Sequence, residues 1–411
     1  MGTGAAGVQL SMHPRFQARW FLATLLAGVV ACDEPDPATI SVDSNGTAVL
    51  AVADEGDPWR IVTPVLGRAS FEVRGPYALV SVCTRFLNDV GRDTAHVTVQ
   101  LRDPADEPPR DAGCSLEASE TGMAVDVTVA GDWFTEVQLE NYVLGPGATA
   151  AVERGVHDLV VFDGVHDLMS IERGFQIDRQ VTLRPDASVA RPIVQRPAPT
   201  VDGLVATDTS PAFYVTYATA NGQDAWYYQS SPGPTSGVRD VPFELTEPGD
   251  HHAIVGYAQH LATGSVRATS APITSPTEPT SISLSLIDPL VPPIVSHAPL
   301  RATWDGPGSW DRATLEFNDL DGLLILTATA TAAWLGSNAD GATLSIPDLT
   351  TIPGWQAWWS PLPSTTTSLV RLRRGSGERW DEVAAYGRAA DTPALAGIDS
   401  LRLAPAARPA R

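Results

Sequence analysis

The sequence has no lysine among its 411 residues, so all 27 basic side chains are arginines. Without lysine, the chain cannot form a Schiff base with a carbonyl substrate or with pyridoxal phosphate, and it lacks the lysine of phosphate-binding P-loops. The sequence also has no Gly-x-Ser-x-Gly elbow and no His-Glu-x-x-His segment. These absences predict a protein that is not an enzyme and that binds no cofactor.

Positive charge is also scarce relative to negative charge. The 27 basic residues face 48 acidic ones, which gives the chain a formal charge of −21. Removal of residues 1–31 would take away Arg15 and Arg19 but no acid, which changes the formal charge to −23. Such a surface repels phosphate backbones. We therefore expect no nucleic-acid partner.

Long hydrophobic runs are lacking except near the N-terminus. There the apolar run 20–30 follows Arg15 and Arg19 and ends at the small residue Ala31. Eleven residues in a helix cover about 16 Å, roughly half of a bilayer's hydrocarbon core, so this run is too short to span a membrane. The order of basic, apolar and small residues is typical of a cleaved export signal, here 1–31. A start at Met12 would give a signal of more usual length.

The residues Val29, Val30, Ala31 and Cys32 resemble the lipobox of bacterial lipoproteins. The resemblance implies that Cys32 is acylated after cleavage and that its lipid enters the bilayer. The protein would then be lipid-anchored in the cell envelope, either periplasmic or surface-exposed, with the choice of inner or outer membrane left open. An ordinary cleaved signal and an uncleaved N-terminal anchor are the alternatives.

Only three cysteines are present, and lipidation of Cys32 leaves Cys83 and Cys114. In an oxidising compartment such a pair is expected to form a disulfide. Closing a loop of about thirty residues would stabilise the fold by roughly 3–4 kcal/mol. Two unrelated buried thiols are the alternative.

Most periodic segments alternate apolar and polar residues, as strands do. Examples are 77–83, 94–101, 123–129, 212–218 and 281–286. Short runs of this kind, separated by Gly, Pro, Asp and Asn, predict an all-β fold of tandem antiparallel β-sandwich modules. The alanine-rich stretch 381–390 is the one segment that favours a helix.

Proline-rich stretches divide the chain. The stretch 191–200 (RPIVQRPAPT) is predicted to be a stiff linker, the stretch 274–280 a second one, and the stretch 103–111 a weaker boundary. The predicted modules, which we call modules 1 to 4, are 38–108, 109–195, 198–275 and 280–390. We expect the tail 391–411 to be flexible.

Two modules resemble known sandwich families. The segment 155–160 (GVHDLV) is similar to the Gly-x-Tyr-x-Leu-x-Val strand of carboxypeptidase-regulatory-like, transthyretin-type sandwiches, with His157 at the aromatic position. In module 4, the spacing of 300–304, 313–317 and 344–349 resembles fibronectin type III and immunoglobulin-like domains. Both resemblances imply antiparallel β-sandwiches.

Three segments carry potential metal ligands, but their spacing argues against a site. If Asp163 and Gly164 form a two-residue turn, then His157 and His166 lie about 13 Å apart along a hairpin. His251 and His252 are neighbours on a strand and point to opposite faces. The segment 317–322 (FNDLDG) is similar to part of a calcium loop but lacks its other ligands, so we predict a turn. No metal site is expected.

Tryptophan is concentrated near the C-terminus, where 354–360 reads GWQAWWS. If this piece is extended, Trp355 and Trp359 face one way and Trp358 faces the other. The outward-facing aromatic could bind a sugar ring or a partner protein. Packing of all three tryptophans over the sandwich is the alternative.

Together these features predict a membrane-anchored lipoprotein with a structural, adhesion or assembly role. Its partners would be the bilayer and an envelope protein or polysaccharide. One alternative is a carbohydrate-binding surface protein that uses Trp355, Trp358 or Trp359. Another is a hydrolase whose paired acids converge only in the fold.

Overall fold

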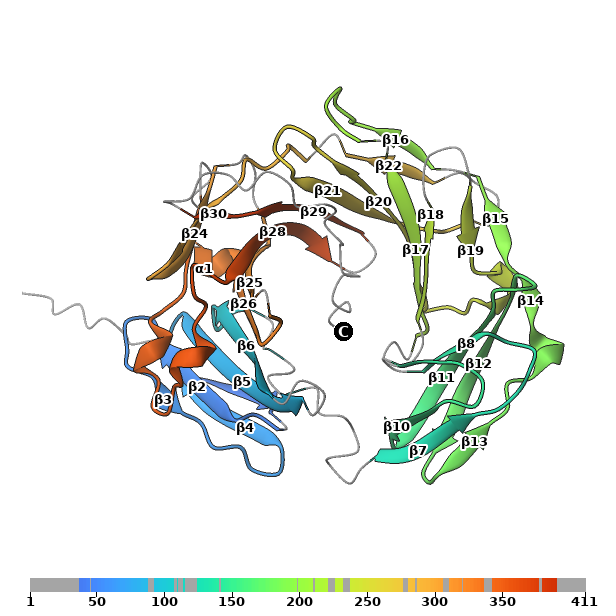
Figure 1. Cartoon of the computed structure of the whole chain (residues 1–411), viewed down its shortest axis with the longest axis horizontal. Helices are drawn as coiled ribbons and strands as arrows, with labels where there is room; N and C mark the ends of the chain where they lie inside the picture. Colours follow the sequence, from blue (N-terminus) through green and yellow to red (C-terminus); the bar gives the residue numbers. More distant parts are fainter. Residues whose placement is uncertain are drawn as a thin grey trace, which may run out of the picture. The chain divides into compact units, whose positions relative to one another are not determined.

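The structure is a computed structural model that describes residues 37–389 with short gaps. The gaps are residues 45, 88–91, 107–108, 110–113, 115–123, 140–141, 198, 210, 221–225, 232–236, 276–279, 285–286, 306–309, 320, 336–341 and 377–378. The predicted signal, Cys32 and the predicted tail lie outside the described residues. Strands make up most of the described part, in which the α-helix α1 (Ala332–Leu335) has four residues (Figure 1). The predicted all-β class is therefore confirmed.

Module 1 has two layers of strands. One layer pairs β1 (Ala38–Asp43) with β4 (Arg68–Val73), and the burial of alternate residues in both strands follows the sequence pattern. The other layer contains β2 (Val49–Asp54), β3 (Arg60–Ile61), β5 (Tyr77–Leu87) and β6 (Arg92–Arg102). The two inner faces meet through Ile40, Val52 and Phe71.

A disulfide joins Cys83 of β5 to Cys114, with the two Cα atoms 5.4 Å apart. The bond thus links Cys114, which follows β6 in the sequence, to a strand of this layer. The predicted pairing of the two cysteines is confirmed.

Module 2 is built of two sheets around its own core. The smaller sheet has the order β10–β7–β13, and the larger has the order β14–β12–β11–β8–β9. Val129, Val137, Leu159 and Ile177 are among the buried residues between them. The strands are β7 (Ala124–Val129), β8 (Glu136–Leu139), β9 (Tyr142–Leu144), β10 (Thr149–Glu153), β11 (Gly155–Asp163), β12 (Leu168–Ile177), β13 (Val181–Leu183) and β14 (Arg191–Pro192), with the 3₁₀ helix η2 (Ala187–Val189) before β14.

The turn between β11 and β12 differs from the prediction. Asp163 pairs with Leu168, so the loop has four residues, 164–167, instead of two. The Asp163 carboxylate accepts the Val165 N–H at 2.9 Å and contacts His166 Nδ1 at 2.5 Å, and Asp167 takes a positive φ of 55°. Because the Asp163 side chain binds backbone and side-chain groups of the loop, it favours a four-residue turn over the two-residue turn that the Asp-Gly pair suggested.

Module 3 packs short outer strands against a longer sheet. Phe213, Val215, Ile254 and Ile282 are buried between the layers. Gly256 is required at this place, because a Cβ there would lie 2.9 Å from the Ile282 side chain. The elements are β15 (Val194–Arg196), β16 (Thr200–Asp202), β17 (Ala212–Ala218), β18 (Trp226–Ser231), β19 (Val238–Asp240), η3 (Phe243–Leu245), β20 (His251–Gln259), β21 (Val266–Pro272) and β22 (Ser281–Ser283). We describe β15 and β22 with module 3, although they extend beyond its predicted bounds, because they pair with β19 and β16.

The stretch 191–200, predicted to be a stiff linker, is instead part of the folded structure. It contains β14 and β15 and the first residue of β16, and each of these strands pairs with a strand of a sheet. Proline is tolerated because these strands are short and lie at sheet edges. The prediction of a linker was therefore wrong.

The largest apolar cluster of the described residues lies in module 4 and continues into module 1, where it includes Val80 and Val97. Trp304, Phe317, Leu344 and Trp359 are among its buried side chains. The elements are β23 (Ile294–His297), β24 (Leu300–Trp304), β25 (Arg312–Asp319), β26 (Leu324–Thr331), α1, β27 (Ala342–Ser345), η4 (Leu349–Thr351), η5 (Ala357–Trp359), β28 (Thr366–Ser376), β29 (Arg379–Tyr386) and β30 (Arg388–Ala389).

The stretch 381–390, which favoured a helix by composition, forms strands β29 and β30 up to residue 389. β29 lies between β21 and β28 and is hydrogen-bonded to both. Ala384 and Ala385 are fully buried there. Packing in the middle of a sheet thus overrides the helical preference of alanine, and the helix prediction was wrong.

One twelve-stranded sheet contains strands from three modules, in the order β18–β17–β20–β21–β29–β28–β25–β26–β6–β5–β2–β3 (Figure 1). Module 3 joins module 4 through the antiparallel pair β21–β29, and module 4 joins module 1 through the parallel pair β26–β6. The module ends stay predictions, but hydrogen bonding continues across them.

Candidate functional site

The tryptophan segment 354–360 is held by a turn and a short 3₁₀ helix. Gly354 takes a positive φ of 84°, and η5 follows, with the Trp359 N–H donating to the Gln356 carbonyl at 2.9 Å. The segment is therefore a turn and a 3₁₀ helix and not the extended piece on which the assignment of its faces depended. Pro361 follows Ser360 directly, and the chain stays irregular until β28 begins.

The three tryptophans differ in exposure. Trp359 is only 2% exposed, Trp355 is half-buried, and Trp358 is 39% exposed. Trp359 packs edge to face against both neighbours, with ring centroids 5.4 Å from Trp355 and 6.0 Å from Trp358. Trp355 and Trp359 thus lie inward, and Trp358 lies outward. An extended strand would also place Trp358 on the face opposite the other two, but here the 3₁₀ helix η5 is the cause.

Hydrogen bonds fix the two less buried indoles. Trp355 Nε1 donates to Ser360 Oγ at 3.0 Å, and Trp358 Nε1 donates to Gln356 Oε1 at 2.6 Å. The chain shortly before this segment contacts module 1, because Trp59 Nε1 donates to the Asp348 carbonyl at 3.0 Å. An outward indole with its N–H already bonded can offer its ring face to an apolar or sugar surface.

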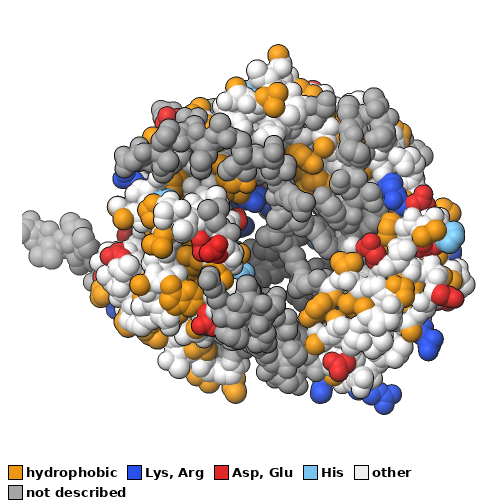
Figure 2. Space-filling view, in the orientation of Figure 1, with side chains coloured by type: hydrophobic (Ala, Val, Ile, Leu, Met, Phe, Trp, Pro, Cys, Tyr) orange, Lys and Arg blue, Asp and Glu red, His pale blue; other side chains and the backbone are white. Residues whose placement is uncertain are grey.

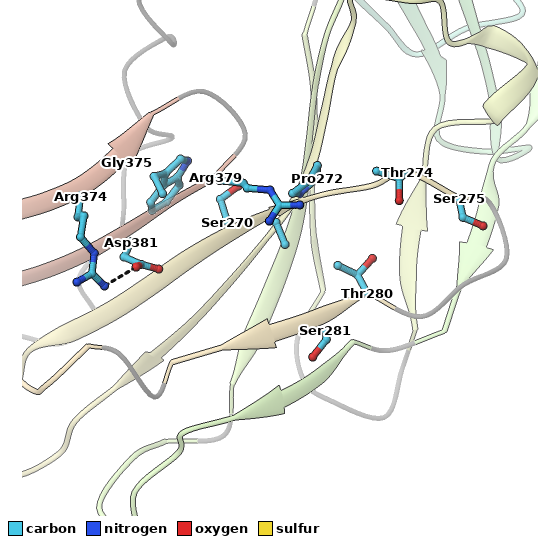
Figure 3. A pocket seen from close by; sticks show the side chains of 12 residues that line it. Ser270, Pro272, Thr274, Ser275, Thr280, Ser281, Arg374, Gly375, Arg379 and Asp381 are labelled. Atoms are coloured by element: carbon cyan, nitrogen blue, oxygen red, sulfur yellow. Dashed lines mark hydrogen bonds and ion pairs between the residues drawn. The ribbon is translucent and has the colours of Figure 1, made fainter.

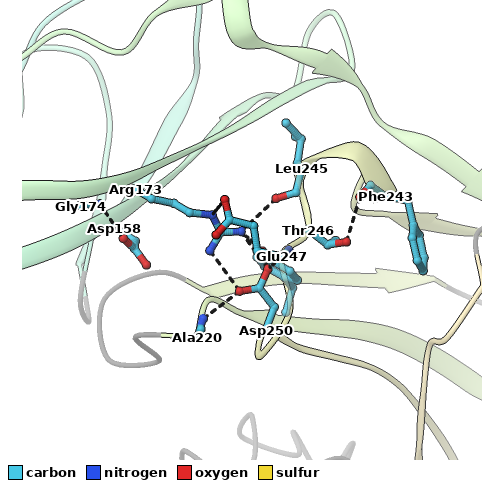
Figure 4. Close-up of polar contacts among 10 residues, drawn as sticks. Asp158, Arg173, Gly174, Ala220, Phe243, Leu245, Thr246, Glu247 and Asp250 are labelled. Atoms are coloured by element: carbon cyan, nitrogen blue, oxygen red, sulfur yellow. Dashed lines mark hydrogen bonds and ion pairs between the residues drawn. The ribbon is translucent and has the colours of Figure 1, made fainter.

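A second site, which the sequence did not indicate, is centred on Arg173 of β12 in module 2 (Figure 4). Its guanidinium binds the Asp250 carboxylate of module 3 with two hydrogen bonds, of 3.0 and 2.8 Å. Its Nη2 also donates to Tyr217 Oη at 2.8 Å and to the Leu245 carbonyl at 2.9 Å. We call this arrangement the Arg173 clamp.

The Asp250 carboxylate in the clamp has several donors besides Arg173. Tyr217 donates to it at 2.5 Å, and it accepts the backbone N–H of Ala220 at 2.8 Å and of Glu247 at 2.7 Å. Burial raises the pKa of Asp250, but the hydrogen bonds from Arg173, Tyr217 and Glu247 outweigh burial and hold this pKa below its ordinary value. Burial, followed by the hydrogen bond to Asp250, raises the pKa of Tyr217 above its ordinary value. The clamp therefore holds a carboxylate, a guanidinium and a neutral phenol.

An apolar cluster beside the clamp also joins modules 2 and 3. Val160 and Met169 of module 2 pack with Tyr217 and Val241 of module 3. Near this cluster, Arg239 forms an ion pair with Asp167 and lies over the Phe162 ring, 5.2 Å from its centroid. The contact between these two modules is thus both apolar and charged.

Two further buried arginines bind aspartates within module 3. Arg196 and His252 both contact Asp240, at 2.6 Å each, and Arg267 pairs with Asp208. Burial raises the pKa of Asp240, but His252 and Arg196 outweigh this effect and lower it. The two arginines lie 44 and 59 residues from their aspartates, so no local pattern in the sequence marks these pairs.

The remaining histidines do not converge. His157 is buried in β11 opposite Phe175, whereas His166 is exposed in the β11–β12 loop. His260 contacts Thr263 Oγ1 at 2.9 Å. Across the described part of the chain, His, Cys, Asp and Glu form no group of three that could hold a metal ion.

The segment 317–322 contains a turn, as predicted, although residues 317–319 still belong to β25. The Gly322 N–H donates to the Asp319 carbonyl at 2.9 Å, and Gly322 has a positive φ of 69°.

On the face shown in Figure 2, the arginines and acids of the described residues are scattered among other side chains. No helix among the described residues is long and apolar enough to cross a membrane. Cys32, the predicted lipid site, lies outside those residues.

Comparisons with known proteins found little. No protein-family model and no curated protein matches the chain. A solved structure described as a tetra-tandem repeat in the extending region of a large adhesion protein aligns with 86% of this chain and 100% of its own, at 9% identity and a TM-score of 0.15. A TM-score this low indicates neither a shared fold nor a shared function.

Proposed function

We propose that the chain is an exported lipoprotein, cleaved before Cys32 and anchored to a membrane by lipid on that cysteine. The observation that carries this proposal is the Cys83–Cys114 disulfide. Disulfides persist in oxidising compartments outside the bacterial cytoplasm, and the basic, apolar and small residues before Cys32 supply the export signal that such a location requires.

The anchor would hold module 1 close to the bilayer. Strand β1 begins at Ala38, and the six residues after Cys32 span at most about 20 Å when extended. A tether this short restricts module 1 to the neighbourhood of the headgroups, in the periplasm or on the cell surface.

The anchored protein would act as a structural, adhesion or assembly component and not as an enzyme. Buried arginine–aspartate pairs and a sheet shared between modules suit a protein that must keep its modules in fixed contact. An envelope protein or a polysaccharide is the partner that we propose, and no nucleic acid. Module 2, with sheets of three and five strands and Gly155 opening β11, would be the carboxypeptidase-regulatory-like unit, and module 4 the fibronectin-like one.

The test of the anchor is a Cys32→Ala substitution in the full chain. We expect the wild-type protein in the membrane fraction with a diacylglycerol-modified N-terminal cysteine by mass spectrometry, and the variant in the soluble fraction or retaining its leader. A Cys114→Ala variant controls for misfolding, because it removes a cysteine but should stay with the membrane. An unmodified sulfhydryl at Cys32 in the wild type would contradict the proposal.

A second function, carbohydrate binding, is favoured by the exposure of Trp358. An indole that is 39% exposed and backed by the buried Trp359 offers a rigid face on which a sugar ring can stack. We expect Trp358→Ala to abolish retention of the full chain on an insoluble polysaccharide. Leu362→Ala, an exposed apolar residue nearby in the sequence, should leave retention unchanged. Equal retention of both variants would exclude Trp358 as the site.

A further inference from the structure

A polar pocket of about 510 Å³ lies where module 3 meets module 4 (Figure 3). Its walls come from the end of β21, from the residues that lead into β22, and from the β28–β29 hairpin. This volume falls in the range of pockets that bind small molecules, roughly 300–1,000 Å³. The pocket shares no residue with the tryptophan segment.

Hydroxyl groups account for much of the lining. Thr274 contributes from the segment after β21, and Thr280 and Ser281 contribute from the approach to β22. A hydroxyl can both donate and accept a hydrogen bond, so such a wall complements a ligand that itself carries several hydroxyl groups. An apolar ligand would leave these groups without partners, at a cost of about 1–3 kcal/mol for each one that is buried.

The charges in the pocket do not cancel. Arg374 Nη2 donates to Asp381 Oδ2 at 2.7 Å, and Thr269 Oγ1 donates to the other oxygen of that carboxylate at 2.7 Å. Asp381 is thus bound on both oxygens by its neighbours. Arg379 lines the same pocket and is exposed, and no described acidic side chain forms an ion pair with it. One uncompensated positive charge is left, in a chain whose formal charge is −21.

The hairpin keeps this charge at the pocket. Gly375 has a positive φ of 82°, and a Cβ there would lie 2.4 Å from the Arg379 carbonyl oxygen, so the two strands approach closely at this pair of residues. The next residue, Trp380, is buried under the guanidinium of Arg373, 4.5 Å from its ring centroid. Figure 3 shows the Arg379 side chain reaching toward Pro272 on β21.

We propose that this pocket binds a carboxylate-bearing sugar, such as a uronic acid unit of an anionic polysaccharide. The Arg379 guanidinium would bind the carboxylate through two parallel hydrogen bonds, and the serine and threonine hydroxyls would bind the sugar hydroxyls. A singly charged carboxylate matches the single free guanidinium. A phosphate of charge about −2 would need a second free cation, and Arg374 is already paired with Asp381.

The proposal goes beyond the lipid anchor and does not depend on it. It also concerns a ligand, a pocket and residues other than those of the Trp358 site. Failure of binding here would leave the fractionation of the Cys32→Ala variant unaffected, so the two proposals can fail separately.

The test measures binding of tri-galacturonic acid to the full chain by isothermal titration calorimetry. The fully methyl-esterified trisaccharide, which keeps the hydroxyls but carries no charge, and sodium acetate, which carries the charge without the hydroxyls, are the comparison ligands. The variants are Arg379→Gln, the pocket-filling Thr280→Trp, and Arg184→Gln as a control, because Arg184 is exposed in module 2 and lines no part of the pocket. Circular dichroism verifies that each variant is folded.

We expect the acidic trisaccharide to bind the wild type and the Arg184→Gln variant equally. The methyl ester, acetate and both pocket variants should show at least a tenfold weaker affinity. The proposal is overturned if the acidic trisaccharide does not bind, if its ester binds as tightly, or if Arg379→Gln binds like the wild type. Weak binding that Arg184→Gln reduces as much as Arg379→Gln would indicate only a general attraction of anions to arginine, and it would also overturn the proposal.

Discussion

Single residues in the interior carry much of the specificity of this fold, and the Arg173 clamp is the clearest case. Asp250 is 2% exposed at its side chain, yet it is charged and accepts hydrogen bonds from two side chains and two backbone amides. Removing one partner of a buried, hydrogen-bonded ion pair leaves the other charge without compensation, which costs about 3–5 kcal/mol. Substitution of an exposed residue that contacts the same arginine should lower the free energy of unfolding far less.

We therefore predict that Asp250→Asn lowers the free energy of unfolding by about 3–5 kcal/mol, measured by urea denaturation at pH 7. Glu247→Gln is the matched control, because Glu247 contacts the same guanidinium at 3.3 Å but is 62% exposed, and it should cost less than about 1 kcal/mol. Similar losses for the two variants would mean that burial of Asp250 is not what gives the pair its strength.

The same residue predicts how stability depends on pH. The pKa of Asp250 is lower in the folded than in the unfolded protein, where it is about 3.9. Its contribution is therefore fully present above about pH 4 and is lost as the pH falls through the folded value. In denaturation series from pH 7 down to pH 3, the wild type should lose stability more steeply than Asp250→Asn, and parallel curves would contradict this assignment.

Among the elements, the β28–β29 hairpin shows how backbone geometry limits the sequence. Gly375 and Gly322 both have positive φ angles, of 82° and 69°, but a Cβ on Gly322 would meet no atom within 4 Å, whereas one on Gly375 would lie 2.4 Å from a backbone oxygen. We predict that Gly322→Ala costs about 1 kcal/mol, from the left-handed conformation alone. Gly375→Ala should cost at least twice as much, and thermal unfolding of the two variants under one condition measures the difference.

The elements also indicate where prediction from sequence succeeds. Strands 212–218 and 300–304 were predicted to the residue, because a proline precedes each run, turn-forming residues follow it, and the residues between them favour strands. The stretches 191–200 and 381–390 were predicted wrongly, because their strands are stabilised by partners distant in the sequence and not by local preference. At the candidate site, residue parity placed Trp358 apart from Trp355 and Trp359, but it assumed an extended segment, whereas the segment contains a 3₁₀ helix. The Arg173 clamp could not be foreseen, since its ion-pair partners lie 77 residues apart and nothing in either local segment marks them.

For the whole molecule, the disulfide is the covalent constraint that can be removed without changing the core. The loop between Cys83 and Cys114 corresponds to a sequence separation of 31, for which loop-closure entropy gives about 3–4 kcal/mol. We predict that the Cys83→Ser, Cys114→Ser double variant loses roughly this amount in urea denaturation. A reducing agent should then lower the stability of the wild type toward that of the variant while leaving the variant unchanged, and no effect on either would show that the bridge is not formed.

The parallel pairing of β6 with β26 has a consequence for how the protein matures. Until module 4 has been synthesised, the outer edge of β6 presents unpaired N–H and C=O groups, because its neighbour β26 belongs to a segment that follows two further modules. Pairings between such distant segments form slowly, and an open strand edge invites association with other chains. The nascent protein therefore passes through a stage in which a long strand edge is open, and the risk of association with other chains is greatest while modules 2 and 3 are being synthesised.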